Sequence, residues 1–465
     1  MRIGYHLKRA QEVVGSLSLA REFVSHDRWT IHQIREYQDQ RMRSLVKYAI
    51  EHSPFYREFY ARIDPDKPYD YESLPVLTKK IMMDNYDRFV TDSKLKIHDL
   101  QEHVHNLTRD EYYLGSYRVL STGGSSGLTG FFAFNRSEWR TLIGAWQRAM
   151  KYLGYPLRLP NRWKVAFIGA RHPRHMSSRL TESSDLGLLI MLRLSASEPL
   201  EEMVKALNEF QPEILSGYPS IEALLAQEQL EGRLNIHPSI VACSAEILAE
   251  DMKQKIRAAW GKNPFNMYLA TEVVTLGVTC SQDRGIHVFE DLAILEVVDE
   301  NNRRVPDGVL GNRVLLTNLH YFTQPLIRYE LTDMLKVFPE PCPCGRPFPL
   351  LEAIEGRSDD ILELEGFDCR TVSVHPITFR SALGKTPGLR QYQVVQRQGD
   401  LHFNLVALDH ENTEELSRKV ESIMTRNLED RGVKCPPPLT SDWGKMKVSC
   451  GQDEWLWPLT IDGLP

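Results

Sequence analysis

The sequence predicts an α/β protein with a large N-terminal domain of mainly parallel sheets, followed by a small, mobile α+β domain at the C-terminus. Three observations lead to this fold class. The chain of 465 residues is long enough for more than one domain. Short apolar strands alternate with amphipathic helices between residues 164 and 270, a pattern typical of a parallel sheet with covered faces. The segment after residue 360 contains strands and a helix of its own.

Composition narrows the class of protein. Apolar residues make up 42% and charged residues 25% of the chain, which is ordinary for a globular protein. The net charge of −6 implies no excess of basic surface, so we expect no nucleic-acid partner. No apolar run reaches the roughly 18 residues that a membrane span needs, and the first ten residues lack the apolar core of a signal peptide. We therefore expect no membrane partner and a cytoplasmic location.

Residues 29–52 predict an amphipathic helix ahead of the α/β region. Ile34, Met42, Leu45 and Val46 recur at steps of three and four residues. Pro54 ends the pattern, because the residue before a proline disfavours the helical conformation. We interpret this segment as a helix that packs on the core, and the alternative is a surface for a partner.

Predicted strands and helices alternate between residues 164 and 270. The predicted strands are 164–169, 213–216, 240–243 and 265–270, and the predicted helices are 200–210, 221–229 and 249–260. From residue 286 to residue 338 the pattern changes to strands at 286–289, 292–298 and 312–319, separated by turns at 299–302 and 306–308. This change predicts an antiparallel, barrel-like segment.

A second domain is predicted at the end of the chain. Strands at 391–395 and 401–407 flank a turn at 398–400, and a helix follows at 414–428. The boundary is expected just after Arg357, which gives domains of residues 1–358 and 359–465.

The stretch from Ser121 to Gly130 predicts a loop that holds phosphates. It contains four glycines, five hydroxyl residues and no charge. Glycines allow positive φ angles and a close approach of the backbone to a ligand, and successive N–H groups can then form an anion-binding concavity. The alternative is a flexible connector between two strands. The stretch is not a Walker loop, because no Gly-Lys-Ser/Thr follows it.

Four later stretches, together with this loop, resemble the motifs of a known family. They are Ser244-Ala-Glu246, Tyr268-Leu-Ala-Thr-Glu272, Arg328-Tyr-Glu-Leu-Thr-Asp333 and Gly356-Arg-Ser-Asp-Asp360. In this order the chain resembles the adenylate-forming superfamily, in the branch of phenylacetate–CoA ligases, coenzyme F390 synthetase-like proteins and capsule-biosynthesis homologues. That branch shows Tyr-Gly-x-Thr-Glu, Pro-Leu-Ile-Arg-Tyr-x-x-Gly-Asp and Gly-Arg-x-Asp-Asp. The match is especially close at residues 324–329.

The resemblance implies a reaction and its partners. A carboxylate attacks the α-phosphate of ATP, which gives an acyl-adenylate and pyrophosphate, and an acceptor then attacks the acyl group. The acid would be an aryl or other small organic acid, and the usual acceptor is the thiol of CoA. An amine or a carrier-protein thiol is the alternative acceptor, and a nucleotide-binding homologue without turnover is the alternative to an enzyme. A homodimer is compatible with these expectations.

The resemblance also implies roles for single residues. Residues expected to hold the phosphates are Thr122, Gly123, Gly124, Ser125, Ser126 and Gly127. Residues expected around the nucleotide are Thr271 and Glu272 near the α-phosphate, Asp333 on the ribose, Arg357 on ribose or phosphate, Tyr268 near adenine, and Ser244, Ala245 and Glu246 along that pocket. Glu272 would also hold Mg²⁺, which prefers one or two carboxylates together with phosphate oxygens. Lys445 is the expected catalytic lysine, with Lys447 as the alternative, and Asp359 is the expected hinge.

Cysteine and histidine residues predict a second site. Cys342 and Cys344 lie one residue apart in a Pro/Gly turn, and Cys280 and His287 lie upstream. Three cysteines and one histidine are a common set of ligands for structural zinc. The seven cysteines do not suggest a disulfide framework, because their number is odd and the expected compartment is reducing. We interpret the four residues as a structural zinc site that joins two strand-rich segments; free thiols in a loop are the alternative.

Overall fold

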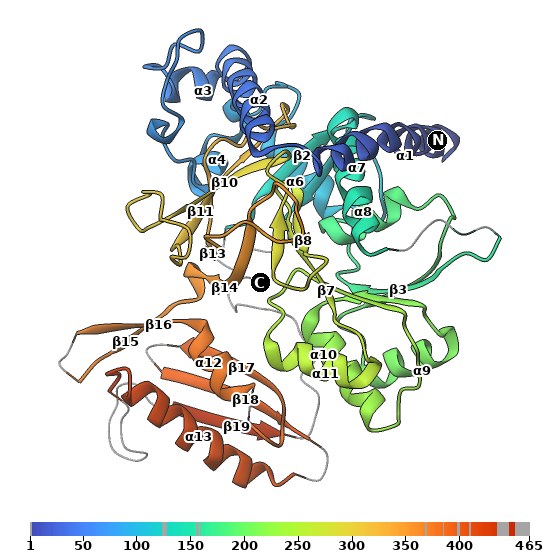
Figure 1. The fold of residues 1–465 in the computed structure, drawn as a ribbon, viewed down its shortest axis with the longest axis vertical. Coiled ribbons are helices and arrows are strands. Elements are labelled where there is room, and N and C mark those ends of the chain that lie inside the picture. Colours follow the sequence, from blue (N-terminus) through green and yellow to red (C-terminus); the bar gives the residue numbers. More distant parts are fainter. Residues whose placement is uncertain are drawn as a thin grey trace.

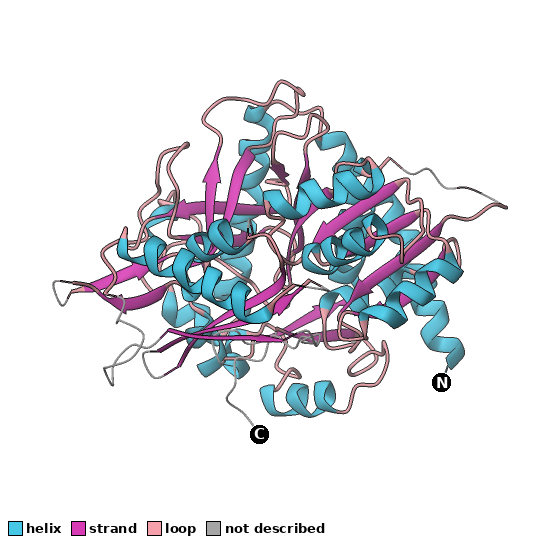
Figure 2. Cartoon of the chain, turned by 90° about the horizontal axis from the view of Figure 1, so that it is seen from below, coloured by secondary structure: helices cyan, strands magenta, loops and turns pink. Residues whose placement is uncertain are grey.

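The computed structural model has a larger N-terminal unit and a smaller C-terminal unit (Figure 1). It describes residues 2–122, 128–154, 158, 160–367, 370–384, 386–397, 400–408, 411–434 and 446–451. Helices and strands are mixed throughout, as predicted from the sequence (Figure 2). Within these ranges, no helix is both long enough and apolar enough to cross a membrane.

A large sheet runs through the N-terminal unit. Among the described residues it has nine strands, in the order β13-β14-β9-β8-β7-β6-β5-β3-β4. From β7 to β4 neighbouring strands are parallel. These strands are β3 (Lys164–Gly169), β4 (Ile190–Ser195), β5 (Ile214–Gly217), β6 (Ile240–Ser244) and β7 (Phe265–Ala270). The alternation of strands and helices predicted for this region is confirmed.

Helices connect the parallel strands, and local signals explain where they begin and end. They are α8 (Met176–Ser184), α9 (Leu200–Phe210), α10 (Pro219–Leu230) and α11 (Glu250–Trp260). Pro219 occupies the first turn of α10, where its missing N–H leaves no intrahelical hydrogen bond unmade. Gly261 ends α11 in the left-handed conformation, with φ of 65°. Leu200, Met203 and Leu207 form the buried face of α9.

The sheet changes to antiparallel pairing after β7. The strands of this half are β8 (Val274–Thr279), β9 (Ile286–Val288), β13 (Asp333–Val337) and β14 (Leu350–Arg357). The reversal between β7 and β8 takes three residues, and Val274 at its end has a φ of 74°. A positive φ is uncommon for a β-branched residue and indicates local strain in this turn.

The barrel-like segment predicted for residues 286–338 forms no closed barrel in the described part of the chain. Instead, β10 (Ala293–Val298), β11 (Arg313–Asn318) and β12 (Tyr329–Leu331) make a separate antiparallel sheet. β12 ends at Leu331 and β13 begins at Asp333, so the chain changes sheets at Thr332. The segment was antiparallel as predicted, but its strands are divided between two sheets and do not close on one another.

Further helices of the N-terminal unit precede the parallel strands in the sequence. They are α1 (Arg2–His26), α2 (Ile31–His52), α3 (Pro54–Phe59), α4 (Lys79–Asp84), α5 (Tyr86–Phe89), α6 (Ile97–His105) and α7 (Arg136–Tyr152). The predicted amphipathic helix is α2, and its apolar face is buried, which confirms packing as its role. A capping box between Thr30 and Gln33 starts the helix at Ile31. α1 was not predicted, because exposed apolar residues such as Leu7 and Val14 obscure a single apolar stripe.

The C-terminal unit has its own apolar core. Its elements are β15 (Leu362–Glu365), β16 (Thr371–Val374), α12 (Pro376–Leu383), β17 (Leu389–Arg397), β18 (Asp400–Ala407), α13 (Thr413–Glu429) and β19 (Met446–Gly451). β17 and β18 form the predicted antiparallel pair, and β19 adds parallel to β18. Phe403, Val420 and Met424 are fully buried in a cluster that contains only residues of this unit. The boundary at residue 358 and the mobility of the unit stay predictions.

The stretch with the closest family match, residues 324–329, is structural in this fold. Nε2 of Gln324 donates to the carbonyl oxygen of Phe131 (2.9 Å), and its Oε1 accepts from the N–H of Ala133 (3.0 Å). The side chain thus replaces a neighbouring strand along one edge of β2 (Phe131–Asn135). Arg328 is buried and donates from Nε to Glu296 Oε1 (3.1 Å). The motif therefore joins the strands around the glycine-rich loop.

Replacement of Gln324 with alanine should destabilise the larger unit strongly. The variant leaves a buried carbonyl and a buried N–H of β2 without partners, at a cost of about 1–3 kcal/mol for each group. We expect the free energy of unfolding, measured in urea by far-ultraviolet circular dichroism, to fall by about 2–4 kcal/mol. Gln254→Ala is the control, because that exposed side chain donates to Glu250 on its own helix. Equal losses in both variants would contradict this role for Gln324.

Candidate functional site

The glycine-rich stretch connects β1 (Tyr117–Ser121) to β2. Thr122 closes the base of the loop, because its N–H donates to the carbonyl oxygen of Gly130 (3.0 Å) and its Oγ1 accepts from the N–H of Gly130 (2.9 Å). The N–H of Ser121 donates to the carbonyl oxygen of Arg174 (3.0 Å), which ties the loop to the end of β3. Residues 123–127 lie outside the described ranges, so their contacts with phosphate stay predictions.

Tyr268, Asp333 and Arg357 meet at one point although they lie far apart in the sequence. The hydroxyl of Tyr268 donates to Oδ2 of Asp333 (2.7 Å), and Nε of Arg357 lies 3.5 Å from Oδ1. Asp333 and Arg357 are also paired residues of β13 and β14. The Asp333 side chain keeps 16% of its surface exposed, so its carboxylate is held by protein groups yet open to a ligand. The arrangement offers an oriented anionic acceptor with a cation beside it.

Burial raises the pKa of the Tyr268 phenol well above its usual value, and the charge of Asp333 adds to the effect. Tyr268 is therefore a neutral hydrogen-bond donor at physiological pH. The predicted contact of its ring with adenine stays a prediction.

Glu272 lies in the turn between β7 and β8, next to Thr271, and belongs to the same site. Burial raises the pKa of its carboxyl, while the charges of Lys79 and Arg357 oppose the rise and that of Asp333 adds to it. These mutual effects place Glu272 within the electrostatic field of Asp333 and Arg357. A buried carboxylate of this kind fits the expected Mg²⁺ ligand, because a divalent cation offsets the cost of burying its charge.

Lys79 was not among the residues predicted for the site. It is the first residue of α4, which begins after Thr78, whose side chain accepts from the N–H of Ile81 (3.2 Å). Its charge lowers the pKa of Glu272. A Thr-Lys-Lys run after a proline is common in surface loops, so the sequence carried no signal for this role. The electrostatic effect of Lys79 on Glu272 depends on tertiary packing, because the two residues lie far apart in the sequence.

The stretch from Ser244 to Glu246 follows β6. Ser244 is buried, and Ala245 has a φ of 67°, a left-handed conformation that is uncommon for alanine. Such strain often marks a functional site. Glu246 accepts a hydrogen bond from the N–H of Ser220 (3.2 Å) in the first turn of α10. Glu246 thus has an internal role at a helix N-terminus, and the contacts of the stretch with adenine stay predictions.

Basic residues follow β3 on the loop that meets the glycine-rich stretch. Arg171 pairs with Glu198 (3.2 Å), and Nε of Arg174 donates to Nε2 of His175 (3.2 Å). Burial and the charge of Arg174 lower the pKa values of His172 and His175, that of His175 to about 4. Both imidazoles are therefore neutral at physiological pH. The loop combines neutral donors and acceptors with cations at the edge of the site.

The expected hinge residue lies within the described part of the chain, whereas the expected catalytic lysine does not. Asp359 lies in the short helical turn η2 (Ser358–Asp360), directly after β14 and before β15. The N–H of Ser358 donates to the carbonyl oxygen of Thr332 (2.7 Å), which fixes the end of the larger unit at this point. Lys445 lies outside the described residues. Lys447 belongs to β19, where it pairs with His402 of β18. The roles of all three stay predictions.

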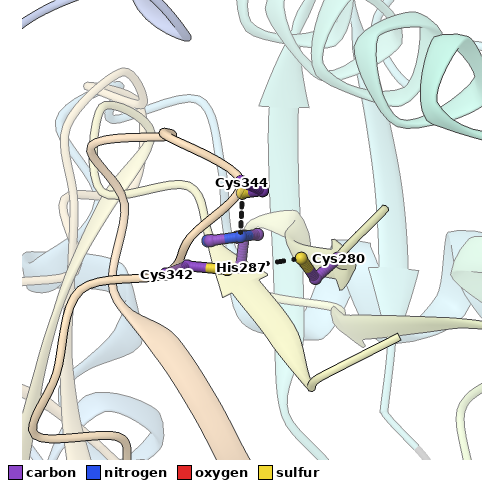
Figure 3. Close-up of side chains that lie close together, drawn as sticks. All are labelled: Cys280, His287, Cys342 and Cys344. Atoms are coloured by element: carbon purple, nitrogen blue, oxygen red, sulfur yellow. Dashed lines mark hydrogen bonds between the residues drawn. The ribbon is translucent and has the colours of Figure 1, made fainter. Parts of the chain in front are cut away.

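The cysteine and histidine residues form a compact cluster, as Figure 3 shows. Ligand atoms of Cys280, His287, Cys342 and Cys344 all lie within 4.8 Å of one another. The Sγ atoms of Cys280 and Cys342 are 3.4 Å apart, and Nε2 of His287 is 3.1 Å from Sγ of Cys344. Nδ1 of His287 contacts the carbonyl oxygen of Phe348 at 3.0 Å. A proton on Nδ1 for that bond leaves the Nε2 lone pair directed at the thiols, as in metal-binding histidines.

Two turns bring the four ligands together. Cys280 directly follows β8, and its N–H donates to the carbonyl oxygen of Gly285 (2.8 Å) in the turn that leads to His287 on β9. A Cβ at Gly285 would lie 2.1 Å from the carbonyl oxygen of Leu351, so only glycine fits there. Gly345, with φ of 80°, closes the turn that contains Cys342 and Cys344. The structure confirms that these residues converge.

Comparison with known proteins agrees with this geometry. No protein-family model matches the chain. The phenylacetate-coenzyme A ligase of Thermus thermophilus is 26% identical over 388 residues, which cover 79% of this chain and 80% of the relative. Protein CapK of Staphylococcus aureus is 22% identical over 374 residues, which cover 76% of this chain and 75% of the relative.

Solved structures share the fold of the whole chain. A 2-hydroxyisobutyryl-CoA ligase in the postadenylation state, in complex with 2-HIB-AMP, has a TM-score of 0.70 at 20% identity and covers 93% of this chain and 89% of that protein. An open conformation of the same ligase, in complex with 2-HIB-AMP and CoA, has a TM-score of 0.59 at 20% identity and covers 95% and 92%.

The chain thus has the fold of adenylate-forming CoA ligases of known structure. Its sequence is similar to those of phenylacetate-coenzyme A ligases and of protein CapK.

Asp333→Ala should weaken the binding of ATP. Charge-assisted hydrogen bonds to ribose hydroxyls are worth roughly 1.5–3 kcal/mol each, so we expect the dissociation constant measured by calorimetry to rise about 10–100-fold. Asp333→Asn should keep a partner for Tyr268 and lose less. Asp66→Ala is the control, because that exposed carboxylate pairs with Lys47 outside the site. An unchanged ATP affinity in Asp333→Ala would remove this residue from the nucleotide site.

Proposed function

We propose that the chain is an AMP-forming ligase that activates a small organic acid with ATP and transfers the acyl group to the thiol of CoA. The observation that supports it most is that Tyr268, Asp333 and Arg357 meet at one point, and that the charges of Asp333 and Arg357 also act on Glu272. The similar proteins add support. One relative is a phenylacetate-coenzyme A ligase, and the structure of a 2-hydroxyisobutyryl-CoA ligase contains 2-HIB-AMP and CoA.

The residues divide the first half of the reaction between them. The carboxylate of Asp333 accepts hydrogen bonds from the ribose hydroxyls, and the hydroxyl of Tyr268 holds that carboxylate in place. N–H groups and hydroxyls of the glycine-rich loop bind the phosphates, and Arg357 adds positive charge. Oxygen of the acid attacks the α-phosphate, and the bond to the β-phosphate breaks with release of pyrophosphate. Mg²⁺ held at Glu272 would neutralise phosphate charge.

The second half transfers the acyl group. The thiol sulfur of CoA attacks the acyl carbonyl, the bond to the phosphate oxygen breaks, and AMP leaves. The chain superposes better on the postadenylation structure, with a TM-score of 0.70, than on the open one, with 0.59, and we infer that its two units lie as in the postadenylation state.

The proposal is tested by ATP–pyrophosphate exchange with a panel of aryl, short-chain and hydroxylated acids. At least one acid should support exchange in the parent, and CoA should then yield a thioester and AMP in equal amounts. If exchange occurs but the product is an amide or an acylated carrier protein, the acceptor is an amine or a carrier-protein thiol and not CoA. Absence of ATP binding would overturn the proposal.

Lys445→Ala should slow adenylation far more than it weakens ATP binding. A lysine that meets charge developing in the transition state contributes to the rate, and loss of one such donor costs roughly 10²–10³-fold. The single-turnover rate of acyl-adenylate formation measures the effect, with Lys447→Ala as the matched control. A loss confined to the Lys447 variant would transfer the role to that residue.

We also propose that Cys280, His287, Cys342 and Cys344 hold one structural zinc ion. The three sulfurs and one ring nitrogen fit the donor set that zinc takes in closed tetrahedral sites, and their mutual distances allow a shared ion. Four protein ligands leave no open position for a substrate. The ion would fix the hairpin of β8 and β9 to the loop before β14.

Zinc content and stability test this site together. The purified protein should retain about one equivalent of zinc through gel filtration, because binding contributes folding free energy directly. Cys344→Ser should lower both the zinc content and the melting temperature. Cys243→Ser should keep the zinc, because Cys243, on β6, lies outside the cluster and its thiol donates to Glu222 on α10. Metal-free parent protein, or unchanged stability in Cys344→Ser, would reduce the cluster to ordinary thiols.

A further inference from the structure

A buried ion pair crosses from the smaller unit to the larger one. Nη2 of Arg390, on β17, lies 3.0 Å from Oε1 of Glu228, on α10. The two side chains keep only 10% and 5% of their surfaces exposed. Figure 1 places β17 and α12 against α10 and α11, so the pair lies where the two units meet.

Glu228 has a second cationic partner within its own unit. Nη2 of Arg233 donates to the same Oε1 at 2.8 Å, and the N–H of Arg233 donates to the carbonyl oxygen of Glu228 (3.0 Å). Glu228 therefore stays paired when the smaller unit moves away. Arg390 would lose this carboxylate and regain water.

Two further contacts mark the same interface. A Cβ at Gly384, at the end of α12, would lie 3.1 Å from Cγ of Asp251 on α11, so the units approach closely at a glycine. Burial raises the pKa of Tyr392 on β17 to about 12, and the charge of Asp251 adds to the rise. β17 and α12 thus both face α11, beside the ion pair.

We propose that Arg390 and Glu228 form a latch that holds the smaller unit in the arrangement in which the acyl-adenylate is made, and that the latch opens for the thiol step. This inference rests on the proposed function. Both are positioning residues, because neither lies among the groups that gather around Asp333.

The chemistry of the pair suits a contact that must form and break in each cycle. A buried ion pair adds little net stability, because the cost of removing the charges from water offsets their attraction. It can still favour one arrangement, because the contact between Arg390 and Glu228 exists only while the two units are docked. Arg233 keeps Glu228 compensated in the open arrangement, so opening exposes Arg390 to water without leaving a bare carboxylate buried.

Arg390→Ala and Arg233→Ala form a matched pair of variants for the test. Each removes one guanidinium from Glu228, but only Arg390 belongs to the other unit. Small-angle X-ray scattering of the substrate-free protein reports the arrangement without any activity. We expect a larger radius of gyration for Arg390→Ala than for the parent, and the parent value for Arg233→Ala.

The two half-reactions give the second readout. In Arg390→Ala the single-turnover rate of acyl-adenylate formation should fall roughly tenfold, while thioester formation from supplied acyl-adenylate and CoA should stay the same or rise. Arg390→Lys should restore part of the adenylation rate. In a Glu228→Gln background, the effect of Arg390→Ala should be smaller than in the parent, because the contact between the two side chains is already lost.

Three results would overturn the latch. They are a parent-like radius of gyration in Arg390→Ala, an equal loss in both half-reactions, and an equal effect of Arg233→Ala on the ratio of the two rates. Scattering decides the conformational claim even if no acid supports adenylation. Conversely, exchange in the parent supports the proposed function even if Arg390 has no effect on it.

Discussion

The candidate site depends on a bend in the central sheet. Three strands separate β7 from β13 in hydrogen-bonding order, and strands about 4.8 Å apart would place them about 19 Å apart in a flat sheet. A tyrosine cannot span that distance, yet the Tyr268 hydroxyl lies 2.7 Å from Asp333. β14 pairs with β9 only at Leu350 and Leu351, whereas it pairs with β13 from end to end. The β13–β14 ribbon is thus fixed at one end and turns back towards β7 at the other.

The thiol and imidazole cluster lies at the fixed end of that ribbon. His287 pairs with Leu350, the first residue of β14, and Cys344 lies in the loop just before it. Arg357 is the last residue of the same strand and faces Asp333. One strand therefore has the candidate metal site at its beginning and the candidate nucleotide site at its end, followed directly by the expected hinge. The position of the smaller unit depends on the same segment, because β15 follows it within five residues.

Sequence patterns predicted the parts of the fold that local periodicity determines. Strands β3 to β7, their helices and α2 fall where alternation and amphipathic spacing placed them. The ligand cluster was predicted because cysteine and histidine residues are chemically distinctive. No local pattern in the sequence indicated the contacts between residues that lie far apart in the chain. The charge of Lys79 acts on Glu272 only through tertiary packing, and the strands of residues 286–338 are divided between two sheets. Gln324 and Arg328 carried the family likeness, although their contacts build the scaffold around the loop.

The central claim is that the bend assembles one nucleotide site from three distant segments. Amide hydrogen exchange, followed by mass spectrometry with and without Mg²⁺ and ATP, tests this claim most directly. We expect ATP to protect segments 120–130, 268–275 and 332–358 together, and Asp333→Ala to remove the protection of all three at the same ATP concentration. Protection of only one of these segments, or of a different surface, would contradict a single site built by the bent sheet.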